Sequence, residues 1–494
     1  MPRESLSIRS LSLATIAIIA LTLSCFAQTE SVIYNFQGTT DGSSPQSTPI
    51  ADAQGNLYVT TATATGCCGA VVQLKPPSTP GGSWSETTIY SFAGPPNDGY
   101  WPRAGLIADS SGNLYGTTFY GGPTGCNIGG PVLGCGTVFE LSPPATSGGA
   151  WTETILYNFQ GGTVDGRYPT ASLVFDNQGN LYGTTTSGGN GFCYGFPGDC
   201  GTAFKLSPPT KTGGKWRERI LHNFGNGSDG QYPNSALVID PSGVLYGTTE
   251  LGGPNDCSPD LGANMFCGTV FQLTPPSAPN LRWAERYFSL GPANGHGFFV
   301  AAGLVEGPNG KLYGVTANGL ATTTASCVDA LGFGQGCGMI FEITPPSLNN
   351  GHWGFAHLYN FADLGDGAVP LSSLIIDSAG NLFGTASTGG GLGTCHDDKL
   401  APEQVSVNGC GTVFELSPPT AKGHPWTETT LHQFPGGTDG ARPIGGVMSD
   451  SKGDLFGTTW EGGIGTSCGD LNGCGTVFEI TLKAFPVNGC LTPP

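Results

Sequence analysis

Short hydrophobic segments separated by turn-forming residues run along almost the whole chain. In residues 172–224, Val, Ile, Thr, Tyr and Phe are frequent in four segments, 172–175, 180–186, 202–206 and 216–224. Gly, Pro, Asn and Asp cluster between these segments, and the sequence Asp-Asn-Gln-Gly at 176–179 is typical of a tight hairpin connection. The pattern predicts a unit of four short β-strands.

The same unit occurs seven times. Its clearest phrase is Gly-Asn-Leu-Tyr-Gly-Thr-Thr, which is intact at 112–118 and 179–185. The aromatic residue of this phrase recurs every 57–73 residues, at Tyr58, Tyr115, Tyr182, Tyr246, Tyr313, Phe383 and Phe456. A fixed period of this kind indicates a repeat architecture. We expect these aromatic residues to be part of the core.

A closed ring of such units would give every sheet a neighbour on both of its faces. Sheets that are apolar on both faces need a neighbour on each face, so the chain is predicted to be all-β, a seven-bladed β-propeller of four-stranded blades over residues 31–481. The seventh unit stops after its third strand, at 476–481. Residues 31–36 match the fourth-strand phrase at 156–159, so the N-terminal strand should complete blade 7 and leave no open edge.

The recurring phrases also point to a family. Gly-Asn-Leu-Tyr-Gly-Thr-Thr, Gly-Gly and Gly-Cys-Gly-Thr-Val-Phe-Glu-Leu resemble the Gloeo/Verruco (GloVer) tandem repeat of exported bacterial proteins, over nearly all of residues 31–481. The resemblance implies an exported bacterial repeat protein and brings no catalytic residues. Some members look surface-anchored through a C-terminal segment, whereas the 482–494 tail here ends in Leu-Thr-Pro-Pro without an apolar stretch.

Residues 1–27 have the pattern of a secretory signal peptide. Arg3 and Arg9 precede an apolar stretch at 11–23, and cleavage is expected after Ala27. A lipoprotein reading of Cys25 is the alternative, although Thr22 stands where a lipobox has Leu. No later segment holds 18 apolar residues, so the mature chain should have no transmembrane segment. We expect a monomer that is secreted, periplasmic or on the cell surface of a bacterium.

Composition narrows the classes of partner. Only 11% of the 494 residues are charged and the net charge is −18, whereas 10% are aromatic. So few charges disfavour long solvated helices, and the aromatic content is enough for a core. Nucleic acid and anionic membranes are poor partners, because binding them requires a basic face.

The cysteines fall two to a unit, in the loop between the second and third strands. In an exported protein this spacing predicts disulfides, whereas a zinc site would need more ligands near each pair. The predicted disulfide cysteines are Cys126, Cys135, Cys193, Cys200, Cys257, Cys267, Cys327, Cys337, Cys395, Cys410, Cys468 and Cys474. The pairing among Cys67, Cys68 and Cys490 stays open, because the first two are adjacent and the third has no mate.

An Asp-Gly pair recurs in the loop that leads from each unit into the next. Strand direction places these loops and the cysteine loops on one face, which in propellers usually carries the ligand. The aspartates are Asp41, Asp98, Asp165, Asp229, Asp366 and Asp439, with His296 at the fifth position. Turn chemistry explains them best, with a calcium ring as the alternative. No cofactor is otherwise predicted.

Departures from the repeat mark the candidate site. Six of eight tryptophans occupy one repeat position and should pack between blades, whereas Trp101 and Trp460 belong to loops of the ligand face. The candidate ligand-binding residues are Tyr100, Trp101, Arg103, Phe119, Tyr120, Arg442 and Trp460. Aromatic planes beside a few polar groups suit sugar rings. Packing between neighbouring loops is the simpler explanation of the same rings.

Three functions follow from this arrangement. The leading hypothesis is a non-catalytic binding module for a glycan or another cell-surface polymer. The alternatives are a metal-dependent hydrolase or lyase with its site at the channel mouth, and a purely structural envelope protein. No nucleophile elbow between a strand and a helix is recognised and no His-Glu-x-x-His motif is present, so no catalytic residue is assigned.

Overall fold

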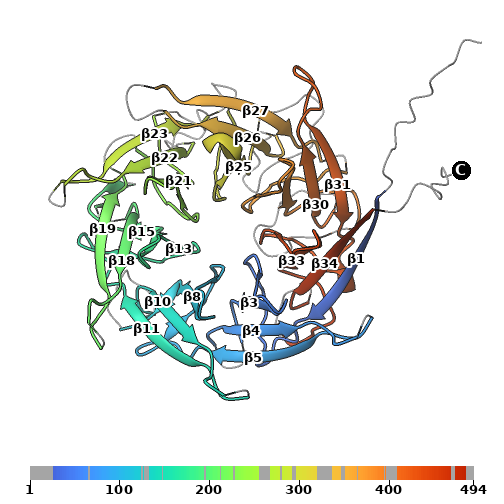
Figure 1. The fold of residues 1–494 in the computed structure, drawn as a ribbon, viewed down its shortest axis with the longest axis horizontal. Helices are drawn as coiled ribbons and strands as arrows, with labels where there is room; N and C mark the ends of the chain where they lie inside the picture. Colours follow the sequence, from blue (N-terminus) through green and yellow to red (C-terminus); the bar gives the residue numbers. More distant parts are fainter. Residues whose placement is uncertain are drawn as a thin grey trace, which may run out of the picture.

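The chain forms a closed ring of β-sheets (Figure 1). The structure is a computed structural model, and it describes residues 26–484 except 65–66, 80, 124–125, 127–132, 147, 194–195, 198, 212, 226–228, 255–266, 279–280, 292–295, 320–335, 347–350, 364, 394, 396–408 and 469–472. Residues 1–25 of the predicted signal peptide, 1–27, lie outside these residues, as do Cys257, Cys327 and Cys490. Within them, no helix is long and apolar enough to cross a membrane.

Seven antiparallel four-stranded sheets form the blades of the propeller, as predicted. Blade 1 contains β2 (Ile50–Ala51), β3 (Leu57–Thr61), β4 (Ala70–Lys75) and β5 (Ser85–Ser91). Blade 2 contains β7 (Ile107–Ala108), β8 (Leu114–Thr118), β10 (Thr137–Ser142) and β11 (Thr152–Asn158). Blade 3 contains β13 (Val174–Phe175), β14 (Leu181–Thr185), β18 (Thr202–Ser207) and β19 (Arg217–Asn223).

The other blades repeat this order. Blade 4 contains β20 (Val238–Ile239), β21 (Leu245–Thr249), β22 (Thr269–Thr274) and β23 (Ala284–Ser289). Blade 5 contains β24 (Val305–Glu306), β25 (Leu312–Thr316), β26 (Met339–Thr344) and β27 (Gly354–Asn360). Blade 6 contains β28 (Ile375–Ile376), β29 (Leu382–Ala386), β30 (Thr412–Ser417) and β31 (Thr427–Gln433). Short ladders join β6 (Gly99–Tyr100) to β9 (Tyr120–Gly121), β12 (Gly166–Arg167) to β15 (Ser187–Gly188), and β16 (Phe192–Cys193) to β17 (Phe196–Pro197).

Blade 7 is completed by the N-terminal strand, as the sequence predicted. It contains β32 (Met448–Ser449), β33 (Leu455–Thr459) and β34 (Thr476–Ala484), and β1 (Phe26–Asn35) pairs antiparallel with β34 from Phe26↔Ala484 to Asn35↔Thr476. Figure 1 shows the blue β1 lying alongside the red β34 at the seam of the ring. The paired strands reach beyond the predicted bounds of 31–481 at both ends.

The blade core explains the Gly of the repeat phrase. Gly183 of β14 lies opposite Phe204 of β18, and a Cβ at Gly183 would come within 2.7 Å of Phe204 Cζ. Phe204 is fully buried, so the missing side chain makes room for the ring. Blade 1 fills the same space with two residues of intermediate size, because Val59 faces Val72 at this position.

The predicted roles of the repeat aromatics are confirmed. The seven core aromatics of the repeat phrase are 5–7% exposed. Trp151 of blade 2 packs edge-on against Tyr58 of blade 1 at 5.9 Å, and Trp283 of blade 4 packs against Tyr182 of blade 3 at 6.4 Å. The tryptophans therefore join neighbouring blades.

Disulfides close the loops between second and third strands. The bonded pairs are Cys67–Cys68, Cys126–Cys135, Cys193–Cys200, Cys395–Cys410 and Cys468–Cys474. Cys267 and Cys337 are also disulfide-bonded. The structure thus confirms the disulfides predicted among the described residues, and it pairs Cys67 with Cys68.

Candidate functional site

The loop that follows each Asp-Gly pair holds one residue in a left-handed conformation, which we call the mouth residue. Its φ lies between 55° and 67° in every blade, although none of these residues is glycine: Ser44, Trp101, Tyr168, Tyr232, Phe299, Val369 and Arg442. Bulky side chains adopt this conformation rarely and at an energetic cost, and such positions cluster at functional sites. Trp101 and Arg442, two of the candidates, therefore occupy the same position in blades 2 and 7.

Backbone hydrogen bonds fix each mouth residue. The N–H of Trp101 donates to the carbonyl oxygen of Cys68 at 2.9 Å, and the N–H of Arg442 donates to that of Cys410 at 2.7 Å. The second cysteine of one blade thus positions the mouth residue of the next blade. The carbonyl oxygen of the mouth residue in turn accepts a hydrogen bond from a backbone N–H in the loop after the second strand. Phe119 donates to Trp101 in this way, and Trp460 donates to Arg442, both at 3.1 Å.

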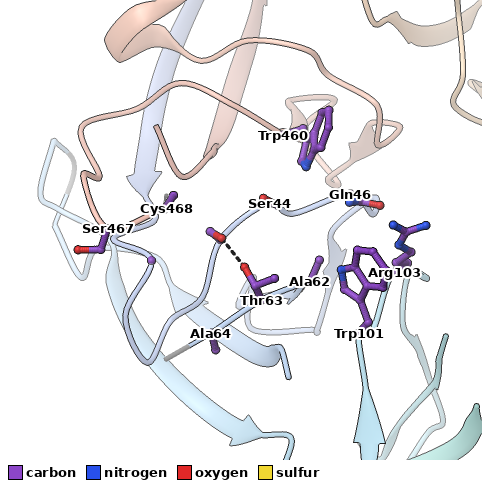
Figure 2. A pocket seen from close by; sticks show the side chains of 12 residues that line it. Ser44, Gln46, Ala62, Thr63, Ala64, Trp101, Arg103, Trp460, Ser467 and Cys468 are labelled. Carbon is purple, nitrogen blue, oxygen red and sulfur yellow. Dashed lines mark hydrogen bonds between the residues drawn. The ribbon is translucent and has the colours of Figure 1, made fainter. Parts of the chain in front are cut away.

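A cavity of about 340 Å³ lies over blade 1, between two tryptophans (Figure 2). Blade 1 has small residues at both loop positions, Ser44 and Ala62, whereas Trp460 of blade 7 and Trp101 of blade 2 stand on either side. The cavity exists because these two large side chains flank a blade that lacks them. Residues of blades 7 and 2, which blade 1 separates, thus line one cavity.

Both tryptophans that line the cavity contain a buried polar atom that has no partner among the described residues. Trp101 Nε1 and Trp460 Nε1 are both buried and make no hydrogen bond within the described part of the chain. In Figure 2 the two indole rings stand on either side of the blade 1 residues. Ser43 and Thr63, which also line the cavity, share a hydrogen bond of 2.6 Å between their hydroxyls. An unsatisfied buried N–H costs about 1–3 kcal/mol.

Arg103 adds a cation at the wall of the cavity. Its guanidinium carbon lies 3.8 Å from the centre of the Trp101 ring and 5.1 Å from that of Phe119. Burial lowers the pKa of Arg103, and the negative charge that Tyr120 can carry opposes this shift. Arg103 Nε is buried without a partner, and within the described residues no carboxylate forms an ion pair with Arg103. The side chain can therefore serve a ligand.

The other aromatic candidates support Trp101 from behind. Tyr100 and Tyr120 face each other in the short β6–β9 ladder. Tyr120 stacks on Trp101 at 5.9 Å with an interplanar angle of 18°, and Phe119 meets Trp101 edge-on at 5.9 Å. Tyr100, Phe119 and Tyr120 do not line the cavity. They hold the Trp101 ring in place, in the way that the packing alternative predicts.

Arg442 lies beside Trp460 but outside the cavity lining. Its guanidinium carbon is 5.1 Å from the ring centre of Trp460, and Nη1 is 3.3 Å from Glu461 Oε1. The Glu461 carboxylate balances the charge of Arg442. The structure therefore brings together Trp101, Arg103 and Trp460 around one cavity, and it leaves the other four candidates around its walls.

A second cavity of about 170 Å³ lies at the channel. Each blade contributes the residues that follow its mouth residue, and these include Gln46, Thr170, Asn234, Leu371 and Ile444. Arg103 lines both cavities. Within the described residues, no His, Asp or Glu lines the channel cavity.

The Asp-Gly aspartates lie away from both cavities, at the outer junctions between blades. Asp165 accepts hydrogen bonds from the N–H groups of Gln160 and Gly166, each at 2.7 Å, and from the Tyr157 hydroxyl at 2.9 Å. The carboxyl of Glu218, from the next blade, faces this group. These contacts agree with the turn interpretation, and calcium binding at the aspartates stays a prediction.

The equivalents of Tyr157, Asp165 and Glu218 form an interblade trio at each junction. Four trios are Tyr–Asp–Glu and two are His–Asp–Glu, while one is Phe288–His296–Phe355. Phe288 stacks on Phe355 at 5.5 Å, and His296 lies 4.1 Å from Phe355. Burial lowers the pKa of His296. Because all three members change together at this junction, they act as one packing unit.

The geometry defines the chain as a seven-bladed β-propeller with a tryptophan-walled cavity at one side of its mouth. The chain belongs to the Gloeobacter/Verrucomicrobia repeat family, whose model matches residues 17–259 and 194–396. This match confirms the resemblance seen in the sequence. No curated protein matches the chain.

Two solved structures are similar to this chain at low identity. One is a putative oxidoreductase (glucose dehydrogenase) from Thermus thermophilus, with 15% identity, a TM-score of 0.37, and coverage of 77% of this chain and 96% of that one. The other is the PQQ-bound form of an aldose sugar dehydrogenase from Streptomyces coelicolor, with 11% identity, a TM-score of 0.41, and coverage of 93% and 100%.

Proposed function

We propose that the protein is an exported, non-catalytic binding module that takes a glycan, or another cell-surface polymer rich in hydroxyl groups, into the cavity over blade 1. The observation that carries this proposal is the pair of tryptophan side chains, Trp101 and Trp460, that stand on either side of one cavity. Aromatic planes stack on the apolar faces of sugar rings.

Size and charge support the same class of ligand. A cavity of about 340 Å³ is at the small end of the range of about 300–1,000 Å³ for ligand pockets. Arg103 supplies further donors without a competing carboxylate, and serine and threonine hydroxyls line the floor. The channel cavity offers no carboxylate or imidazole for acid–base chemistry among the described residues, which favours binding over catalysis.

The location is part of the proposal. The disulfides form in an oxidising compartment, and the apolar stretch at 11–23 provides an export signal. We therefore place the mature chain outside the cytoplasm, as a monomer.

A glycan array probed with the purified mature chain tests the proposal and identifies the ligand. Calorimetry then measures the affinity of the identified glycan for the wild type, for Trp101→Ala, for Trp460→Ala and for the double variant. We expect the double variant to bind at least about tenfold more weakly, because each stacked ring contributes on the order of 1 kcal/mol. Tyr232→Ala, at the mouth position of blade 4, is the matched control and should bind normally.

Stability separates a binding role from a packing role. Trp460 makes few ring contacts, so Trp460→Ala should leave the melting temperature nearly unchanged, whereas Trp101→Ala should lower it through the lost stacking with Tyr120. A double variant that binds normally, or an array with no hit at all, would contradict the proposal and favour a structural envelope protein.

A further inference from the structure

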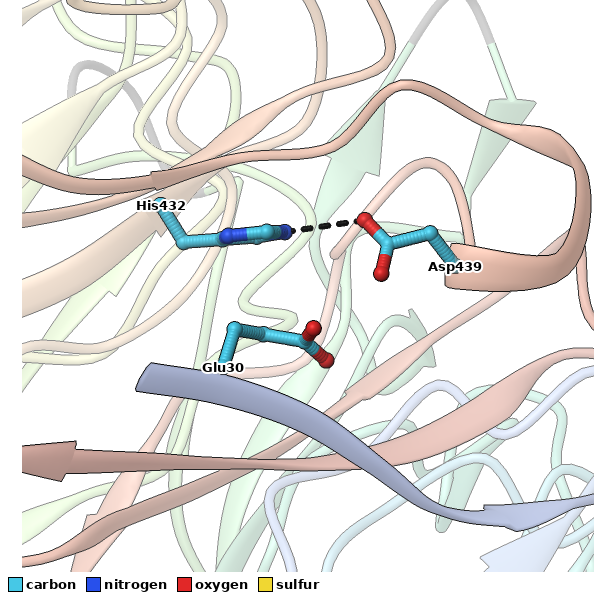
Figure 3. A group of neighbouring side chains, drawn as sticks. All are labelled: Glu30, His432 and Asp439. Atoms are coloured by element: carbon cyan, nitrogen blue, oxygen red, sulfur yellow. Dashed lines mark hydrogen bonds and ion pairs between the residues drawn. The ribbon is translucent and has the colours of Figure 1, made fainter. Parts of the chain in front are cut away.

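Two of the seven interblade trios contain a histidine where four others contain a tyrosine. They are His222–Asp229–Glu285, between blades 3 and 4, and His432–Asp439–Glu30, at the seam beside blade 7. In each, one imidazole nitrogen and two carboxylate oxygens lie within 4.8 Å of one another. Figure 3 shows the seam trio, with Glu30 on β1 below His432 and Asp439. We propose that these two trios are binding sites for a divalent transition-metal ion of the zinc type.

The spacing of the donor atoms fits one small cation. His222 Nε2 lies 3.0 Å from Asp229 Oδ2 and 3.8 Å from Glu285 Oε1. Ligands bound to zinc at about 2.0–2.2 Å in a tetrahedron are about 3.4 Å apart. Three protein ligands with a water molecule at the fourth position complete such a site.

The chemistry of the donors selects the metal. Imidazole nitrogen together with carboxylate oxygen suits zinc and its neighbours, whereas calcium and magnesium take oxygen ligands. At the Tyr–Asp–Glu junctions the phenol instead donates a hydrogen bond to the aspartate, as Tyr157 does to Asp165 at 2.9 Å. His222 and His432 make the same contact with their aspartates at 3.0 Å, and a neutral imidazole nitrogen, unlike the phenol, can bind a metal ion instead.

The glutamate ligand atom in each trio has no hydrogen bond in the described part of the chain. Glu285 Oε1 and Glu30 Oε1 are both buried, and neither makes a hydrogen bond within the described residues. The equivalent oxygens of Glu153 and Glu218, at two tyrosine junctions, are buried without a hydrogen bond to any described residue as well. The two histidine trios differ from these junctions in having an imidazole nitrogen beside the oxygen. The side chains of Glu285 and Glu30 come from the blade after the one that supplies the histidine. A bound ion would therefore satisfy the orphaned oxygen and tie two blades together. At the seam it would tie β1 to blade 6.

Metal content per chain is the direct test. The tag-free mature chain is stripped with a chelator, dialysed against dilute zinc, and analysed by mass spectrometry for zinc and protein. We expect two zinc ions per chain. His222→Tyr and His432→Tyr restore the tyrosine found at the other junctions, so each should fold normally and lose one ion, and the double variant should lose both.

The reverse substitution makes the test independent of any loss of folding. Tyr157→His places an imidazole opposite Asp165 and Glu218, so this variant should gain about one ion. A wild-type chain that binds no stoichiometric zinc would overturn the proposal. So would equal zinc content in the wild type and the double His→Tyr variant, because the ions would then be bound elsewhere.

Discussion

The backbone N–H of Trp101 in blade 2 donates a 2.9 Å hydrogen bond to the carbonyl oxygen of Cys68 in blade 1. Cys68 is itself bonded to its neighbour Cys67. The backbone of Trp101, which forms one wall of the cavity, is thus hydrogen-bonded to a disulfide-bonded residue of the preceding blade. The cysteine loop of blade 1 therefore fixes the position of a tryptophan that belongs to blade 2. The Cys67–Cys68 disulfide therefore bears on the candidate site as well as on its own loop.

Removing this disulfide should affect binding more than stability. Cys67→Ser/Cys68→Ser removes the bond that restrains the Cys68 backbone, whose carbonyl accepts from Trp101. We therefore expect the affinity for the glycan identified by the array to fall several-fold. The bond closes almost no loop, so the free energy of unfolding should change little. Calorimetric titration and thermal melting measure the two quantities.

Cys193→Ser/Cys200→Ser is the matched control. This disulfide joins residues seven apart, and the Cys200 carbonyl accepts from Tyr232, which does not line the cavity. We expect a clear loss of stability, on the order of 2–3 kcal/mol, with normal binding. The same loss of affinity in both variants would show that Cys68 has no special role.

The fold could be predicted because the same sequence signals recur in all seven repeats. Each repeat has the turn residues, the core aromatic and the strand lengths of one blade, and the incomplete last unit reveals the closure by β1. The predicted inner strand of blade 3 at 172–175 is reduced to Val174–Phe175, because the preceding residues belong to the loop that lines the channel.

The site was only partly predictable. Trp101 and Trp460 could be identified because they are the tryptophans outside the repeat position. The cavity between them, however, depends on the absence of large side chains in blade 1, where Ser44 and Ala62 occupy the corresponding loop positions. Aligning the repeats at the mouth position would have shown this gap. The His–Asp–Glu trios were missed because their members come from separate segments and two blades, although the joint change to Phe288, His296 and Phe355 is visible in the sequence.

The Gly–Phe pairing inside the blades predicts a compensated core exchange. Gly183→Val should destabilise the protein by about 1–3 kcal/mol, because its side chain would overlap Phe204 and Leu173. Adding Phe204→Val reproduces the Val59–Val72 pair of blade 1 and should recover part of the loss. Denaturant unfolding measures both, and a double variant less stable than Gly183→Val alone would refute the pairing argument.

Closure by β1 predicts the effect of shortening the N-terminus. A chain that begins at Gln37 lacks the strand that pairs with β34 and exposes an edge, so we expect aggregation and a lower melting temperature. A chain that begins at Ser31 keeps the pairing of residues 31–35 and serves as the control. Light scattering and thermal melting report the result, and a monomeric Gln37 chain with unchanged melting would disprove closure.

The interblade carboxyl pairs predict that stability falls as the pH rises above 5. Burial, and then the charge of Asp165, raise the pKa of Glu218 to about 8. Burial, and then Asp98, raise that of Glu153 to about 7, although a hydrogen bond with Tyr90 opposes the shift. The unfolded value is 4.5 for both, so the folded chain holds more protons in this range, and this stabilisation disappears as the pH passes through 7–8.

The hairpin aspartates act in the opposite direction at lower pH. Burial alone would raise the pKa of Asp176, but hydrogen bonds from Asn180 and Gln178 hold it below its usual 3.8. This contribution is present above pH 3.8 and is lost as the pH falls, so the melting temperature should peak near pH 5.

Glu218→Gln, which mimics the protonated acid, should raise the melting temperature at about pH 8.5 and flatten the decline above pH 5. Glu140→Gln, whose carboxylate accepts from Ser142 at 3.0 Å, is the control and should leave the profile unchanged. Melting curves at constant ionic strength decide the matter, since a melting temperature that rises from about pH 5 to 8 would contradict the proton balance at these junctions.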